Sequence, residues 1–195
     1  LDIPFQHASP SVLKAMRRPG NQEKTLERIR KWREICPDLA IRSTFIVGYP
    51  GETEEEFQAL LNFTAELQFD RLGAFTFSFE PGTDSEPLGD PVPPEVKEER
   101  KARLMEQQQR ISLKKNQFFI GKTLNVLVEG KGDGISLGRS YRDAPEIDGM
   151  VIVEGDLPVG EMVPVRITGA MAYDLAGTVD TAPARVVRQP IARVA

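Results

Sequence analysis

The hydrophobic pattern of this chain changes its period once, near residue 119, and this change divides the sequence into two parts of different fold class. Up to residue 93, short β-rich stretches alternate with stretches of helical spacing. The expected strands are 1–5, 40–47 and 72–79, and the expected helices are 10–16, 22–35 and 53–67. Because strands joined by helical crossovers run parallel, residues 1–93 predict part of an α/β sheet or barrel.

Two segments connect this part to the rest. Residues 80–95 hold five of the fifteen prolines, which predicts a loop. Residues 94–118 predict a long polar helix with only a thin apolar seam, formed by Val96, Leu104, Ile111 and Phe118. We expect such a helix to lie across another surface.

From residue 119 to residue 187 the apolar period is two. Five short strands are expected, with Gly and Asp at the turns between them. Five short strands in this length are typical of a small closed β-barrel of the OB type. Residues 188–195 are left as a tail.

Composition excludes several classes of protein. The single cysteine, Cys36, excludes an internal disulfide framework, and one cysteine with one histidine argues against a transition-metal site built by this chain. No apolar run reaches the roughly 18 residues of a membrane helix, and no signal peptide is visible, so we expect a cytoplasmic protein. The chain begins inside an expected strand and without methionine, which favours a fragment of a longer protein over a processed N-terminus.

The charge of the second part points to a basic partner. Residues 119–180 hold ten acidic and five basic residues, within a chain of net charge −4. Proteins that bind nucleic acid directly usually carry the opposite sign, because phosphate contacts dominate their affinity. An acidic surface suits a basic protein, although solubility alone would explain the same charge.

Three expected strands end abruptly in polar or glycine residues, at 6–9, 48–52 and 78–83. Ligands of parallel sheets bind at the carboxyl ends of the strands, so these ends predict a binding site, although each could be only a turn or a cap. Glycine lets a ligand approach the backbone closely. The acids Glu52 to Glu56 argue against phosphate and leave a cationic ligand or simple helix capping, with Thr53 and Glu56 as a capping box.

Other candidates have two interpretations each. His7 could be a general base, but it has no visible Asp or Cys partner, which favours a hydrogen-bonded wall residue. Arg17 and Arg18 could bind an anion or could only favour the end of a helix. Cys36 lies away from the three strand ends and is interpreted as structural.

Three stretches together resemble the radical S-adenosylmethionine (SAM) methylthiotransferases. These are "LDIPFQHASPSVLKAMRRPG", "RSTFIVGYPGETEEEF" and "SFEPGTDSEPLGDPVPPEVKEER". The tail of the chain resembles their TRAM domain, and "GRSYRDAPEIDGMVIV" is similar to the branch called RimO. The resemblance covers residues 1–187 and implies the latter part of a radical SAM barrel, a half barrel of the TIM-like type, followed by a five-stranded TRAM barrel.

The resemblance also implies chemistry. Members of this branch add a methylthio group to the β-carbon of an aspartate in ribosomal protein S-twelve, using SAM and two four-iron four-sulfur clusters. The cluster cysteines of the family are not in this sequence, so we expect this chain alone to bind no cluster. By position, Gln6, His7 and Ser9 would face the reacting centre, and Arg42 or Ser43 would reach the methionyl carboxylate of SAM. The remaining implied SAM-pocket residues are Gly48, Tyr49, Pro50, Gly51 and Glu52, with Ser78 and Phe79 near the adenine.

The acidic barrel would then bind the basic ribosomal protein, and we expect Asp143, Glu146 and Asp148 to belong to the docking face. Two rival functions remain at this point. A transfer-RNA methylthiotransferase would carry a basic TRAM surface. A non-enzymatic binding scaffold would have no affinity for SAM.

Overall fold

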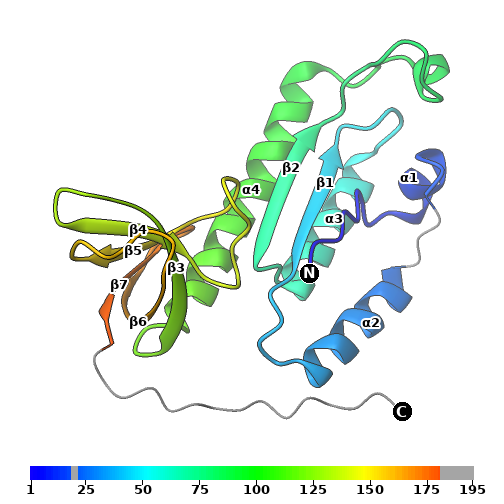
Figure 1. Cartoon of the computed structure of the whole chain (residues 1–195). Coiled ribbons are helices and arrows are strands. Elements are labelled where there is room, and N and C mark those ends of the chain that lie inside the picture. Colours follow the sequence, from blue (N-terminus) through cyan, green and yellow to red (C-terminus); the bar gives the residue numbers. More distant parts are fainter. Residues whose placement is uncertain (19–21, 181–195) are drawn as a thin grey trace. The chain divides into compact units, whose positions relative to one another are not determined.

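A computed structural model describes residues 1–18 and 22–180 of the chain (Figure 1). The tail predicted at 188–195 lies outside the described residues. The chain divides into two compact units, one from Leu1 to Phe118 and one beginning at Phe119, and each is described by itself.

The sheet of the first unit consists of two parallel strands, β1 (Arg42–Val47) and β2 (Arg71–Thr76), in register from Arg42 opposite Arg71 to Val47 opposite Thr76. The segment before α1 runs parallel to β1 on its other side, through bridges of Asp2 with Arg42 and Gln6 with Phe45. The predicted strand at 1–5 is therefore reduced to isolated bridges. Pro4 lies between them and has no N–H to donate to a continuous ladder.

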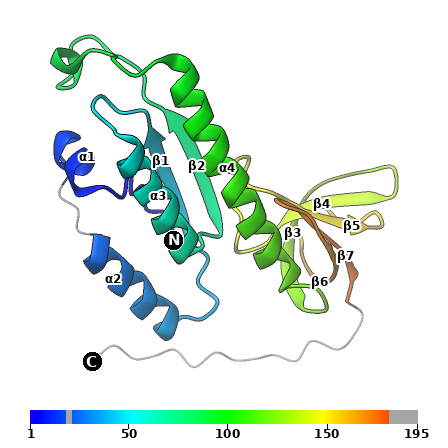
Figure 2. The same cartoon turned by 180° about the vertical axis from the view of Figure 1, so that it is seen from behind.

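Four α-helices of this unit match the predicted ones closely. They are α1 (Pro10–Ala15), α2 (Gln22–Ile35), α3 (Glu54–Leu67) and α4 (Pro94–Gln117), with a short 3-10 helix, η1, at Glu86–Leu88. Helices α3 and α4 both lie on one face of the strands, which is turned toward the viewer in Figure 2. The opposite face carries no helix among the described residues of this unit, and Phe75 of β2 is 60% exposed.

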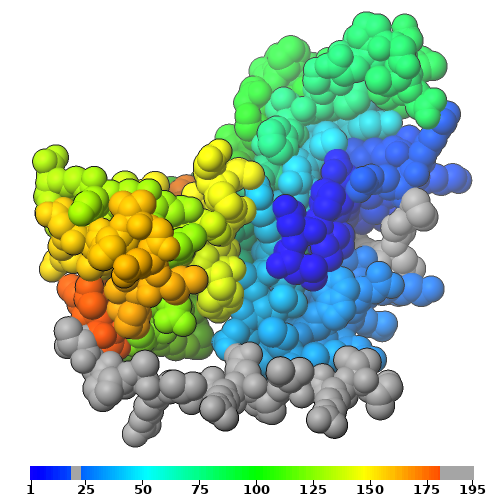
Figure 3. Space-filling view, in the orientation of Figure 1, coloured from blue at the N-terminus to red at the C-terminus, as the bar shows by residue number. Residues whose placement is uncertain are grey.

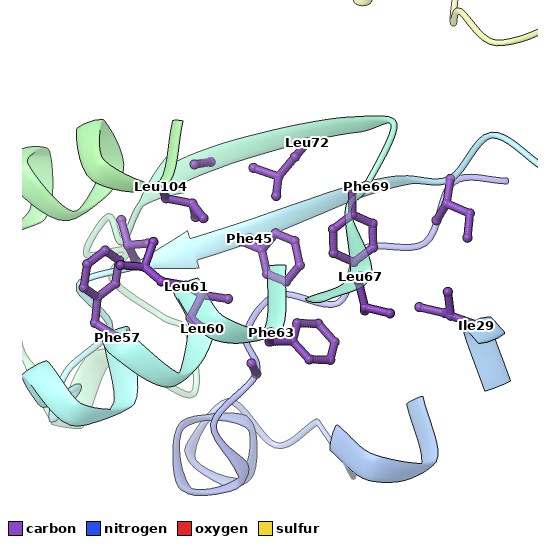
Figure 4. Packing of buried hydrophobic residues seen from close by; sticks show 14 residues of the cluster. Ile29, Phe45, Phe57, Leu60, Leu61, Phe63, Leu67, Phe69, Leu72 and Leu104 are labelled. Atoms are coloured by element: carbon purple, nitrogen blue, oxygen red, sulfur yellow. The ribbon is translucent and has the colours of Figure 1, made fainter. Parts of the chain in front are cut away.

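The core of the first unit lies between the strands and the helices (Figure 4). Phe45, Phe63 and Phe69 pack edge to face or tilted, with the Phe45 and Phe69 ring centres 5.5 Å apart. Each buried phenylalanine contributes about 1.5–3 kcal/mol of hydrophobic stabilisation. This core therefore fixes β1 against α3.

The predicted apolar seam of α4 is not the main buried surface of this helix. Leu104 is fully buried, but Val96 and Ile111 are only half-buried, and Phe118 is 66% exposed. The buried positions of α4 are mostly polar and include Lys97, Arg100, Gln108 and Ser112. These long side chains donate to backbone carbonyls and a carboxylate near the strand ends, although Arg100 Nε and Gln108 Oε1 are buried without a hydrogen-bond partner among the described residues.

The second unit is a closed five-stranded barrel, as predicted. Its strands are β3 (Thr123–Gly132), β4 (Ile135–Arg139), β5 (Val151–Glu154), β6 (Met162–Ala170) and β7 (Leu175–Val179). They close in the order β3-β4-β5-β7-β6, and every pair is antiparallel except β5 with β7. Alternate residues of the strands, mostly valine with two leucines and one isoleucine, fill the interior.

Glycine is required where two barrel strands approach most closely. A Cβ on Gly138 would lie 2.3 Å from the Leu127 carbonyl oxygen, and one on Gly177 would lie 2.6 Å from the Arg166 carbonyl oxygen. No helix among the described residues of either unit has both the length and the apolarity needed to span a membrane.

Candidate functional site

Three parallel segments of the first unit end at one edge of the sheet. The first ends at Gln6, β1 ends before Gly48, and β2 ends before Phe77, whose N–H donates to the Val47 carbonyl. We call this the carboxyl edge and define it by Gln6, Gly48 and Phe77. Ligands of parallel α/β sheets bind at such an edge.

A pocket of about 550 Å³ opens at the carboxyl edge, and we call it the edge pocket. Its volume lies in the range of small-molecule sites. Its wall is mainly apolar and comes from Met16, Ile46, Tyr49, Phe75 and Phe77. Its polar lining includes Gln6, Thr44, Ser78, Arg17, Arg18 and Asp84.

An ion pair joins the two sides of the pocket mouth. Arg17 follows α1, Asp84 lies in the loop before η1, and the two side chains are paired although both are more than 70% exposed. Figure 3 shows the green loop that contains η1 next to the blue segment that contains α1. Arg18, the next residue, donates to the Pro4 carbonyl at 2.9 Å. Two guanidinium groups thus lie at the mouth, where they can bind an anionic group.

His7 lies behind the carboxyl edge and does not line the pocket. Its ring is fully buried, and the Ser9 N–H donates to its Nδ1 at 3.0 Å. Nε2 therefore carries the proton and donates to the Glu52 carboxylate at 3.0 Å. This arrangement favours the interpretation of His7 as a hydrogen-bonded support. Ser9 is also buried, and its hydroxyl donates to Glu56 at 3.2 Å.

Glu52 is directed inward, not into the pocket. Its buried carboxylate accepts from the Gly48 N–H, from His7 and from the Arg100 guanidinium at 2.9 Å. The acidic run after β1 is thus used within the protein. Glu54 pairs with Arg103, and Glu56 closes the predicted capping box with Thr53. Burial acts to raise the pKa of Glu56, but hydrogen bonds from Ser11, the Thr53 N–H and Ser9 outweigh it and lower that pKa.

Gly48 was expected in the SAM pocket, but it does not line the edge pocket. Its φ is +70°, which favours glycine, and a Cβ at this position would lie 2.4 Å from Cγ of Lys97. The close neighbour of this glycine is therefore the Lys97 side chain of α4. Pro50 and Gly51 continue the turn outside the pocket lining, and Gly51 is exposed with φ +87°.

Tyr49 does line the pocket. Its ring packs edge to face on Phe77, with centres 5.2 Å apart, and its hydroxyl donates to the Ala15 carbonyl at 3.2 Å. Burial raises the pKa of the Tyr49 hydroxyl, and the charge of Arg17 opposes that rise only in part. Tyr49 is therefore a neutral wall residue that ties α1 to β1.

Arg42 and Ser43 are not at the carboxyl edge. They begin β1, and six residues at strand rise place Arg42 roughly 20 Å from Gly48. Arg42 pairs with Asp2 at 3.5 Å, and the Ser43 hydroxyl accepts from the Phe5 N–H at 3.3 Å. Neither residue lines the edge pocket, so the methionyl role expected for them has no support there. Ser78 lines the pocket, whereas Phe79 is 39% exposed and does not.

The sequence did not identify the pocket residues that lie within β1 and β2. Thr44 and Ile46 share the open face of β1, and Phe75 lies on the same face of β2. Strand alternation was the available signal, because the buried residues of β1 are the odd-numbered ones.

Comparison with known proteins agrees with this architecture. A model of the radical SAM superfamily matches residues 1–64, and a TRAM domain model matches residues 120–179. A Thermus thermophilus protein named "Ribosomal protein uS12 methylthiotransferase RimO" is 58% identical over 91% of this chain and 42% of its own length. Proteins of the same name from Mannheimia succiniciproducens and Methylobacterium radiotolerans are each 56% identical, over 91% and 92% of this chain.

The chain belongs to the RimO methylthiotransferase family. It spans about two fifths of the length of these RimO relatives, 42% of the first and 41% and 40% of the other two. A solved coproporphyrinogen III oxidase from Escherichia coli, described as a radical SAM enzyme, matches 73% of this chain and 41% of its own. Its identity is 18% and its TM-score is 0.47, a likeness too weak to carry an argument.

The part of the chain that the structure describes contains no set of metal ligands for the metal chemistry of the RimO family. No group of three His, Cys, Asp or Glu side chains there could hold a metal ion, and Cys36 is exposed at the end of α2. The described residues therefore do not fit an iron–sulfur cluster.

The three barrel acids expected to dock a partner differ in their surroundings. Asp143 is buried and accepts from the N–H and hydroxyl of Ser140, and Asp148 accepts from the Ala144 N–H at 2.8 Å. Both carboxylates thus shape the loop between β4 and β5, which argues against a docking role for them. Glu146 is exposed, with φ +64°, and remains available to a partner.

Proposed function

We propose that this chain is part of a radical SAM methylthiotransferase that modifies the β-carbon of an aspartate in ribosomal protein uS12. Membership of the RimO family supports the reaction class, and the name of the relatives supports the substrate. The edge pocket is the observation that carries the proposal within this chain, because it lies where parallel α/β sheets bind small molecules.

SAM fits the chemistry of the edge pocket. The nucleoside part needs apolar contact, which Ile46, Phe75 and Phe77 provide, and hydrogen-bonding groups, which Gln6 and Ser78 provide. The methionyl carboxylate needs a cation, and Arg17 or Arg18 takes this role in place of Arg42. When bound, SAM supplies the adenosyl group of the radical chemistry and the methyl group of the product.

The residues of this chain bind, orient and shield. The apolar wall excludes water from one side of the pocket, while the backbone around Gly48 is held by Glu52 and Lys97. In cofactor enzymes the protein contributes such positioning, and the cofactor carries the difficult chemistry. In this proposal the clusters are held by residues that do not belong to the described part of this chain.

We propose further that uS12 docks on the acidic barrel, through Glu146 and other exposed acids. The ten acidic and five basic residues of 119–180 support a basic partner and disfavour transfer RNA as the direct ligand.

The pocket assignment can be tested with Ile46→Lys. Ile46 is half-buried in the pocket wall, so a lysine there removes apolar contact with the nucleoside and adds a positive charge to a pocket that would hold a cationic ligand. In the full-length enzyme with reconstituted clusters, equilibrium dialysis should show SAM affinity falling at least about tenfold, with less 5′-deoxyadenosine formed. Ile35→Lys is the matched control, because Ile35 is 74% exposed at the end of α2 and remote from the pocket lining.

Equal SAM affinity for the two variants and the unmodified enzyme would remove the edge pocket from the proposal. Absence of any SAM binding by the unmodified enzyme would remove the reaction class itself.

A further inference from the structure

Two buried cations of α4 contact the ends of the strands that form the edge pocket. Lys97 and Arg100 lie one turn apart on the same face of the helix, and their side chains are only 6% and 8% exposed. Neither residue lines the pocket. Buried charges are costly unless they are paired, so their partners show what this face of α4 does.

Lys97 contacts the ends of both β1 and β2. Its stem passes over Gly48, where a Cβ would lie 2.4 Å from Lys97 Cγ. Its ammonium donates to the Phe77 carbonyl at 3.1 Å, pairs with Asp90 and lies 5.5 Å from the centre of the Phe77 ring. One side chain thus contacts the residue that follows each strand.

Arg100 acts through Glu52. Its guanidinium donates to the Glu52 carboxylate at 2.9 Å and to the Glu52 carbonyl at 3.2 Å. The same carboxylate accepts from the Gly48 N–H and from His7, the residue after Gln6. Arg100 is therefore connected to the first and second segments of the carboxyl edge, and Lys97 to the second and third.

We infer that Lys97 and Arg100 are positioning residues that hold the three strand ends at the spacing required for ligand binding in the edge pocket. They touch no ligand atom in this arrangement and act through Gly48, Phe77 and Glu52. The inference rests on the proposed function only for the identity of the ligand. The positioning itself is a property of the carboxyl edge and can be measured without SAM.

The test compares Lys97→Met with Arg103→Met in the full-length enzyme. Methionine keeps an apolar stem over Gly48 and removes the ammonium. Arg103 is the matched control, because it is a long cation of the same helix that pairs with Glu54 of α3 and stacks over Phe57, away from the pocket lining.

Hydrogen–deuterium exchange of the ligand-free proteins is the first measurement. Lys97→Met should speed exchange in peptides covering 45–52 and 74–80 and leave the peptides of α2 unchanged, and Arg103→Met should leave all of these unchanged. Unchanged exchange at 45–52 and 74–80 in Lys97→Met overturns the inference. If Lys97→Met does not fold, Arg100→Gln is measured instead, and its expected effect is faster exchange at 45–52.

SAM affinity is the second measurement. Lys97→Met should raise the SAM dissociation constant roughly tenfold, because the Phe77 carbonyl and Asp90 lose their charged donor. It should also lower the melting temperature more than Arg103→Met does, since it leaves a buried acceptor without its donor, so affinity is measured well below both melting temperatures; the dissociation constant of Arg103→Met should stay within about twofold of the unmodified enzyme. Equal SAM affinity in Lys97→Met and Arg103→Met overturns the link between positioning and SAM binding. If the unmodified enzyme does not bind SAM, the proposed function is contradicted. In that case the exchange measurement alone decides whether Lys97 positions the strand ends.

Discussion

At the scale of single residues, the turn after β1 depends on one glycine for two separate reasons. Gly48 has a φ of +70°, and the Lys97 stem occupies the space where a side chain would begin. Gly51, three residues later, has a φ of +87°, but a Cβ there would meet nothing within 4 Å. Comparing substitutions at the two glycines therefore distinguishes the cost of backbone strain from the cost of steric conflict.

Gly48→Ala should destabilise the first unit more than Gly51→Ala does. A non-glycine residue at such a φ costs about 1–3 kcal/mol, and only Gly48→Ala adds the conflict with Lys97. Urea unfolding can be followed by the fluorescence of Trp32, the single tryptophan of this chain, which packs against the core of this unit. In a double-mutant cycle, Lys97→Ala should relieve part of the Gly48→Ala cost and none of the Gly51→Ala cost. Full additivity for both pairs would contradict the steric argument.

Glu56 gives the start of α3 a dependence on pH. Its carboxylate accepts from Thr53, Ser9 and Ser11, and these bonds bring its pKa below the ordinary value of 4.5. Because the folded-state pKa is depressed, the stabilisation is complete above the unfolded-state pKa and is lost as the pH falls through the folded-state pKa.

Glu56→Gln should therefore cost most at neutral pH. The expected loss is about 0.5–1 kcal/mol, since the group is partly exposed and its charge is screened by solvent. The gap to the unmodified chain should narrow below about pH 4.5 in urea unfolding followed by Trp32. Glu66→Gln is the control, because Glu66 lies near the other end of α3 and takes no part in the capping box. A gap that stays constant down to low pH would show that the bonds to Glu56 do not depend on its charge.

At the scale of elements, α4 shows how a helix can be held by polar side chains. Gln107 donates to the Leu61 carbonyl at 2.9 Å, and Gln108 donates to the Phe69 carbonyl at 2.9 Å. Together with Lys97 and Arg100, these residues bind α4 to backbone carbonyls next to the ends of β1 and β2 and to one in the middle of α3. Such carbonyls need partners because burial removes them from water.

Replacing Gln108 by alanine should destabilise the first unit by about 1–3 kcal/mol, the cost of leaving a buried polar group without its partner. The adjacent Gln109 is exposed, so Gln109→Ala has the same change of composition and should cost less than about 0.5 kcal/mol. Chemical denaturation monitored by Trp32 measures both. Equal costs would show that the buried amide contributes nothing beyond helix propensity.

The elements that local pattern determines were predictable, and those that depend on long-range partners were not. The capping box of Thr53 and Glu56, the parallel strands and the closed barrel follow from spacing and turn residues. The polar buried face of α4 does not, because lysine, arginine and glutamine at helical spacing usually indicate solvent. Their partners are backbone groups, which carry no residue-specific signal in the sequence.

The sequence predicted where the candidate site lies, but not the directions of its side chains. Strand order placed Gln6 and Ser78 near the edge pocket, which they line, whereas Arg42 lies at the start of β1 and is not among the pocket-lining residues. Glu52 was expected in the pocket as a carboxylate beside a strand end, and the inward direction of its side chain depends on Arg100, 48 residues later. Direction within a turn is a tertiary property that residue type alone does not determine.

At the scale of the whole molecule, the distribution of charge distinguishes the possible partners. The chain carries a net charge of −4, and residues 119–180 alone carry twice as many acids as bases. Phosphate-rich RNA would be repelled by that surface, and a basic ribosomal protein would be attracted. Since the carboxylates of Asp143 and Asp148 accept hydrogen bonds within their own loop, the proposed docking of uS12 would depend on exposed acids such as Glu146, Glu154 and Glu161.

Reversing these three exposed charges, in Glu146→Lys/Glu154→Lys/Glu161→Lys, should weaken binding of purified uS12 to the full-length enzyme by about tenfold at low salt. The difference should shrink as the ionic strength rises toward 1 M, where the screening length falls to about 3 Å. Surface plasmon resonance across a salt series measures both effects, and most of the change should lie in the association rate. A control, Glu98→Lys, alters an exposed acid of α4 outside the barrel and should change binding far less. If the triple reversal binds uS12 as tightly as the unmodified enzyme at low salt, with or without a new affinity for transfer RNA, the acidic barrel is not the docking surface.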